Sequence, residues 1–125
     1  CLVSALAHHD LVDEIPSRVH VAIPSDHHIP TTSRSIRWHR FAVGTFEVGR
    51  STLDVGGGFV LALYSAERSI VDAYRLRHLH GLEQAREALR TWLSRPGTSP
   101  SALLAVAVRF PKATSMIRRD LQVLL

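Results

Sequence analysis

The spacing of apolar and polar residues changes at Ser65, and this change divides the chain into two halves. Residues 59–64, directly before Ser65, are all apolar or aromatic, which is typical of a buried strand. After Ser65, apolar side chains such as Ile70 and Tyr74 recur at helical spacing. The upstream half therefore predicts mainly strands, and the downstream half predicts helices.

The N-terminal half predicts one short helix followed by four strands. The helix covers residues 1–8, and a loop containing serine, threonine and proline covers residues 25–35. The glycines at residues 56–58 predict a tight turn, because glycine accepts a positive φ without steric cost. The last two strands flank this turn and form a hairpin. The segments with strand-like patterns are residues 17–24, 35–43, 45–55 and 59–64.

The C-terminal half predicts three or four helices. Ser65 is a suitable N-cap for the first helix, which reaches Gly81 and places His78 on its packed inner side. Pro111 ends the third helix. The later helices are expected over residues 82–94, 100–110 and 112–125. The fold class is therefore α+β, with a small, mostly antiparallel sheet packed by three to four helices.

Length and composition predict a single globular domain over residues 1–125. Of the 125 residues, 46% are hydrophobic and 21% are charged, and a disordered chain has fewer hydrophobic residues. The chain begins inside an apolar pattern without a methionine, so we expect a domain cut from a longer protein.

The first residues and the single cysteine predict a cytoplasmic location. One cysteine cannot form an internal disulfide, which favours a reducing compartment. The first residues lack the basic segment of a secretion signal, and Asp10 follows closely. No apolar run is long enough to span a bilayer, so no membrane association is expected.

The basic residues are almost all arginines, which suits contacts with phosphate. Of fifteen basic residues only Lys112 is a lysine, although the formal net charge is a modest +4. If the arginines of the helical half share a face, they can neutralise the phosphates of a nucleic-acid backbone. The alternative is an ordinary solvated surface. The candidate nucleic-acid contacts are Arg77, Arg86, Arg90, Arg109, Arg118 and Arg119.

A second group of polar residues follows Ser65 on the first long helix and predicts structural ion pairs. Asp72 lies four residues after Arg68 and three before Arg75, so both arginines can reach its carboxylate. With Ser65 as the cap, these residues are expected to fix the helix on the sheet. Phosphate contact by the same arginines remains an alternative.

Neither a metal site nor an enzyme is expected. The eight histidines include adjacent pairs whose side chains point apart, and there is no Cys/His framework for zinc, so no cofactor is predicted. In the hairpin, Asp54 has no carboxylate or lysine opposite it on residues 59–64, as a nuclease would need. The glycines at residues 56–58 lack the Lys-Ser/Thr that completes a phosphate-binding loop.

Several segments of the chain, in their order and spacing, resemble the C-terminal domain of the AbiEi-type antitoxins of type IV toxin–antitoxin systems. The resemblance covers nearly the whole chain, and the junction from Tyr64 to Asp72 is its most specific part. It implies a winged helix ahead of this domain, outside residues 1–125. The matching segments are residues 2–11, 13–16, 21–24, 64–72, Arg75, Arg77, Gly81, Leu82, 87–90 and 117–125.

The resemblance also implies partners. Such antitoxins repress their own operon by binding promoter DNA, mainly through the winged helix, and they counter a nucleotidyltransferase-like toxin without necessarily forming a stable complex with it. The C-terminal domain is linked to antitoxicity, DNA binding and assembly. One alternative is a protein-interaction module that contacts the toxin or a second subunit by self-association. A nuclease-like enzyme is the least favoured reading.

Overall fold

Helix α2 (Ala66–Arg75) is the central element of the fold. In the computed structural model, which describes residues 1–31 and 34–125, α2 contacts five other helices, and its residues 68–74 are all buried. Burial of an apolar side chain such as Ile70 contributes about 1.5–3 kcal/mol. The surrounding helices are α1 (Leu2–His8), the one-turn α3 (Arg77–His80), α4 (Leu82–Leu93), α5 (Pro100–Ala107) and α6 (Pro111–Leu124).

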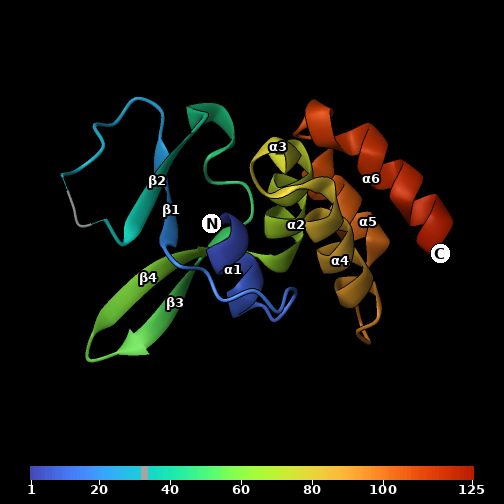
Figure 1. The fold of residues 1–125 in the computed structure, drawn as a ribbon, viewed down its shortest axis with the longest axis horizontal. Helices are drawn as coiled ribbons and strands as arrows, with labels where there is room; N and C mark the ends of the chain where they lie inside the picture. Colours follow the sequence, from blue (N-terminus) through green and yellow to red (C-terminus); the bar gives the residue numbers. More distant parts are fainter. Residues whose placement is uncertain (32–33) are drawn as a thin grey trace.

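The strands form two separate two-stranded sheets. Strands β1 (Val19–Pro24) and β2 (Ile36–Phe41) pair in parallel, whereas β3 (Arg50–Gly56) and β4 (Phe59–Tyr64) form the antiparallel hairpin. Figure 1 shows the strands on one side of the molecule and helices α2–α6 on the other, with α1 between them. The predicted α+β class is confirmed, but the predicted single sheet is replaced by these two pairs.

The connection between β1 and β2 explains their parallel pairing. An antiparallel pair needs only a tight turn, whereas parallel strands need a longer connection that carries the chain back to its starting end. The segment over residues 25–35 provides that length. Thr32 and Ser33, inside the predicted loop, lie outside the described residues.

The predicted third strand, residues 45–55, begins later than expected. A single 3-10 turn, η1 (Val43–Thr45), follows β2, and Gly49 has a φ of +71°. Because Gly49 adopts this left-handed conformation, the extended backbone of β3 begins only after it, at Arg50.

A histidine is the buried side chain of β1. The alternating pattern predicts a half-buried strand, yet Val19 is 55% exposed and His20 only 8% exposed. The burial of His20 is possible because its backbone and its ring both have partners. The backbone N–H donates to Ser4 Oγ at 2.8 Å, and the ring Nδ1 lies 2.8 Å from Nε2 of His39.

The long helix predicted after Ser65 is interrupted at Leu76. The backbone of Leu76 has φ −110° and ψ 28°, and a one-turn helix, α3 (Arg77–His80), follows before Gly81. The interruption rotates the residues after it, so His78 is exposed and the prediction that it packs inward was wrong.

The helix boundaries in the C-terminal half follow the local sequence. Ser65 and Ser99 each accept a backbone N–H at a helix start. Pro111 opens α6 at its first turn, where its missing N–H has no partner to lose. None of the helices in the described ranges is long and apolar enough to cross a membrane.

Candidate nucleic-acid interface

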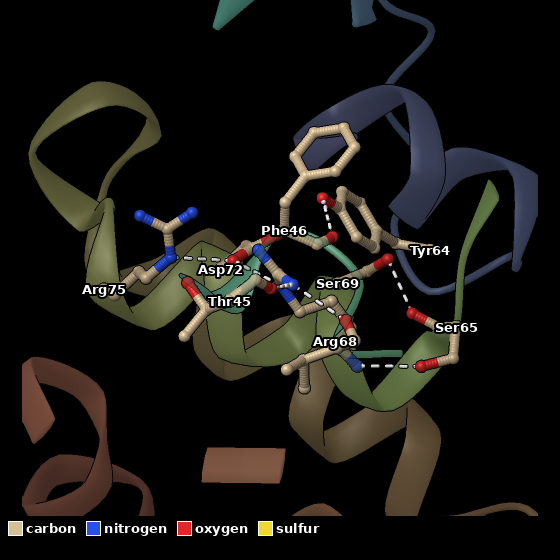
Figure 2. Close-up of polar contacts among 9 residues, drawn as sticks. Thr45, Phe46, Tyr64, Ser65, Arg68, Ser69, Asp72 and Arg75 are labelled. Carbon is tan, nitrogen blue, oxygen red and sulfur yellow. Dashed lines mark hydrogen bonds and ion pairs between the residues drawn. The ribbon is translucent and has the colours of Figure 1, made fainter. Parts of the chain in front are cut away.

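An arginine–aspartate cluster, formed by Arg68, Asp72 and Arg75, lies where α2 meets the strands. Ser65 Oγ accepts the backbone N–H of Arg68 at 3.1 Å. Asp72 Oδ1 accepts the Nε–H of Arg68 at 3.0 Å and that of Arg75 at 2.7 Å (Figure 2). The contacts that the sequence predicted among these four residues are therefore present. The side chains of Arg68 and Asp72 are completely buried.

Arg68 ties α2 to the segment before β3. Its Nη1 donates to the backbone oxygens of Thr45 at 2.8 Å and Val48 at 2.7 Å. Its guanidinium lies 4.2 Å from the ring centre of Tyr64 and 4.6 Å from that of Phe110. A buried guanidinium is costly unless it is paired and hydrogen-bonded. The Nε and Nη1 atoms of Arg68 have such partners and the aromatic rings flank the group, whereas Nη2 is buried without a hydrogen-bond partner among the described residues. The role of Arg68 is therefore structural.

Arg75 links this cluster to the surface. Its side chain is 19% exposed, and its guanidinium lies 4.4 Å from the ring centre of Phe41. Because only its Nε faces Asp72, its two terminal nitrogens point away from the carboxylate (Figure 2). The cluster thus holds two donor groups of Arg75 in a fixed orientation.

A basic depression, which we call the α3–α6 hollow, begins at Arg75. It has a volume of about 470 Å³. Arg77 crosses it, since its Nη1 donates to Tyr74 O at 2.8 Å and to Lys112 O at 3.4 Å. Among the residues that the structure describes, no carboxylate lines it. The lining residues are Arg75, Leu76, Arg77, His78 and Lys112.

The start of α6 adds to the positive potential of the α3–α6 hollow. Lys112 lies in the first turn of this helix, where the helix dipole is positive, although the N–H groups of Ala113 and Thr114 already donate to Phe110 O. A cationic depression beside such a helix end favours a phosphate oxygen. The hollow can therefore bind an anion without any catalytic group.

The six predicted nucleic-acid contacts do not share one free surface. Of these, only Arg77 lines the α3–α6 hollow. Arg86 pairs with Asp120 at 3.0 Å, and Arg109 donates to Gly44 O at 3.4 Å. The remaining three, on α4 and α6, are exposed: Arg90, Arg118 and Arg119.

Arg86 belongs to a second polar network, which contacts α2 through Tyr74 near the C-terminal end of that helix. The hydroxyl of Tyr74 donates to Asp120 Oδ2 at 2.7 Å, and the same oxygen accepts from Arg86 Nε. Burial alone would raise the pKa of Asp120, but the hydrogen bonds from Arg86 and Tyr74 outweigh it and lower this pKa. Burial and the bond to Asp120 raise the pKa of Tyr74. This network joins α2, α4 and α6, so Arg86 is structural.

The sequence pattern did not group Arg75, His78 and Lys112 with Arg77 in one site, and it assigned Arg75 mainly a structural role, with phosphate contact as the alternative. The clue to His78 and Arg75 is the run of basic residues around Leu76, which only the helix break brings to one surface. Lys112 is far from Arg77 in the sequence and lacks a comparable signal.

Known proteins and metal chemistry give no further lead. No protein-family model matches the chain, and no curated protein sequence matches it either. In residues 1–31 and 34–125, no group of three or more histidine, cysteine, aspartate or glutamate side chains is placed to hold a metal ion.

Proposed function

We propose that the chain is a non-catalytic domain that binds duplex nucleic acid through its phosphate backbone. The observation that carries this proposal is the α3–α6 hollow, which places Arg75, Arg77 and Lys112 around one depression. Arginine and lysine at such a site contact phosphates and fix the position of the duplex, but they do not read its sequence. Apart from His78, the lining has no ring on which an unpaired base can stack, so duplex DNA is the preferred ligand.

The resemblance to AbiEi-type antitoxins supports a more specific form of the proposal. In this form, the chain is the C-terminal domain of a cytoplasmic antitoxin that represses its own operon. Its backbone contacts add affinity to a sequence-reading winged helix. A nucleotidyltransferase-like gene next to the one encoding this chain is expected, and an unrelated neighbouring gene would count against the assignment.

Salt dependence tests the backbone contact. Fluorescence anisotropy of a labelled duplex should show affinity falling with salt with a log–log slope of about −2 to −3, as three phosphate contacts imply. Replacing Arg77 and Lys112 with glutamine should reduce the steepness of that slope by about 2. An undetectable response at low salt would exclude the proposal.

A matched variant separates this hollow from the outer surface of α6. Arg118→Gln with Arg119→Gln removes the same charge from exposed positions on that helix. If the hollow is the interface, this pair retains most of the wild-type affinity. A larger loss from the α6 pair than from Arg77 and Lys112 would place the interface on the outer face of α6.

A second candidate function, self-association, is favoured by the β3–β4 hairpin. Phe59 is 71% exposed, Val60 60% and Leu61 57%. Each hairpin strand has one neighbour in the described chain, and residues 59–64 carry no charge that would repel a second copy. Pairing of β4 with its counterpart in a second copy would cover this apolar edge. Light scattering tests it: the wild type should dimerise and Leu61→Lys should not, whereas a monomeric wild type rejects it.

A further inference from the structure

A second basic depression, the α3–β2 hollow, lies on the other side of α3. It has a volume of about 270 Å³ and shares no lining residue with the α3–α6 hollow. Three elements contribute to it: β2, the helix α3, and β1 with the residues just before it. The lining residues are Ser17, Arg18, His20, Arg37, Leu79 and His80.

The strand register brings the cations of this hollow together. Arg18, in the bend just before β1, and His20, on the face of β1 toward the hollow, both line it. Arg37 is the register partner of His20 on the parallel strand β2 and shares that face. Neither arginine has an ion-pair partner in the part of the chain that the structure describes, and both are exposed.

Histidines form the inner wall of the hollow. The ring centres of His20 and His80 are 5.3 Å apart, and the ring of His39 stacks on His20 at 5.1 Å. The Nε2 atom of His80 is buried and has no hydrogen-bond partner among the described residues. A buried ring nitrogen without a partner is uncommon, and an anion in the adjoining space is a partner of the right kind.

We propose that the α3–β2 hollow binds a phosphate group through Arg18 and Arg37, with the imidazoles of His20 and His80 as further hydrogen-bond donors. Two guanidinium groups match phosphate oxygens in charge and geometry. The hollow is large enough for a phosphate and has no carboxylate in its described lining that would repel one. This proposal does not depend on the role of the α3–α6 hollow.

The charged surroundings of His20 couple binding to pH. The pKa of His20 is lowered to about 4, first by burial and then by nearby positive groups: His80 on α3, the terminal ammonium of Cys1 beside α1, Arg37 on β2 and Arg18 before β1. His39, also on β2, has its pKa lowered to about 4, first by burial and then by His20. A bound dianion reverses this repulsion and raises these pKa values. By linkage, the affinity for a dianion increases as the pH falls.

The test follows the histidine ring signals by NMR while inorganic phosphate is added to the chain. We expect saturable shifts of His20 and His80, and an affinity at least about tenfold weaker in Arg37→Gln, the loss of one charge-assisted bidentate contact. Arg40→Gln, which removes an exposed arginine from the opposite face of β2, is the matched control and should retain wild-type affinity. Non-saturable shifts, or equal affinities of the two variants, would overturn the proposal.

Sulfate, which stays dianionic over this range, tests the proton linkage. The affinity of the chain for sulfate should rise as the pH falls from 7.5 to 5.5. The slope of this rise should match the number of protons that the histidine signals show to be taken up on binding. An affinity for sulfate that does not change with pH would show that the histidines take no part in binding the anion.

Duplex DNA distinguishes the two sources of phosphate. If the ligand is a backbone phosphate, Arg37→Gln also weakens DNA binding and reduces the steepness of the salt slope by about 1. If the ligand is a free phosphate or phosphomonoester, Arg37→Gln weakens the binding of inorganic phosphate but leaves the affinity for DNA unchanged. Replacing Arg77 and Lys112 should leave the histidine shifts intact, so failure of the first proposal and failure of this one give different results.

Discussion

The Nε atom of Arg75 lies 2.7 Å from Oδ1 of Asp72. This contact joins a buried structural network to an exposed basic surface. The carboxylate is completely buried and also accepts from Arg68, so it compensates two guanidinium groups. The hydrogen bonds that anchor α2 to the strands thus also determine where the terminal nitrogens of Arg75 point. Asp72 is therefore a positioning residue for the α3–α6 hollow.

Asp72→Ala should lower the free energy of unfolding by about 3–5 kcal/mol, because it leaves Arg68 buried without its counter-charge. Urea unfolding followed by circular dichroism measures this change. Glu87→Ala, at an exposed position on α4, is the control and should change stability by less than about 0.5 kcal/mol. Equal stability of the Asp72 variant and the wild type would show that Arg68 is held by its carbonyl and aromatic contacts alone.

The spacing of residues along α2 allowed this cluster to be predicted, whereas neither of the two hollows could be. Residues three and four apart meet on a helix, so Arg68, Asp72 and Arg75 could be paired from the sequence alone. The α3–α6 hollow depends on a helix break at Leu76 and on Lys112, which comes from another helix. Local periodicity contains neither relationship.

The same limit applies to the sheets. The alternation in residues 17–24 and 35–43 was sufficient to predict strands. Their parallel pairing requires a long connection between the two strands, and the burial of His20 depends on a partner, His39, on another strand. The α+β class follows from local patterns. Which strands pair, and which of their side chains face the interior, follow from contacts between residues that are distant in the sequence.

Tyr74→Phe tests the second network. It removes the hydroxyl that donates to Asp120, and at neutral pH the free energy of unfolding should fall by about 1–2 kcal/mol. The pKa of Asp120 lies below its ordinary 3.8 in the folded chain, so its contribution is present above pH 3.8 and is lost as the pH falls through the folded value. The difference between wild type and variant in urea unfolding should therefore shrink between pH 5 and pH 2.5. A difference that does not depend on pH would mean that the hydroxyl contributes through packing alone.

Acidification should destabilise the chain through His20 and His39. Both have folded pKa values of about 4, below the ordinary 6.5, so the unfolded chain binds protons more readily between these values. Stability is then full above pH 6.5 and is lost as the pH falls toward 4. In a buffer free of phosphate and sulfate, His39→Gln should weaken this pH dependence, whereas His28→Gln in the exposed loop should not. The same slope in both variants would contradict the assignment.

Gly49 tests how tightly the arginine–aspartate cluster is packed against the strands. Its φ is +71°, and a Cβ added there would lie 2.6 Å from Cβ of Arg68 and 3.0 Å from Oγ of Ser65. Gly49→Ala therefore combines backbone strain of about 1–2 kcal/mol with overpacking of about 1–3 kcal/mol. Gly58→Ala is the matched control, because Gly58 also has a positive φ, +79°, but no atom lies within 4 Å of an added Cβ. Thermal unfolding should rank wild type above Gly58→Ala and Gly58→Ala above Gly49→Ala.

Since Ser65 and Arg68 would have to move to accommodate the methyl group, Gly49→Ala should also weaken DNA binding through Arg75, and Gly58→Ala should not. Equal stability of the two variants would show that the start of α2 can shift without loss.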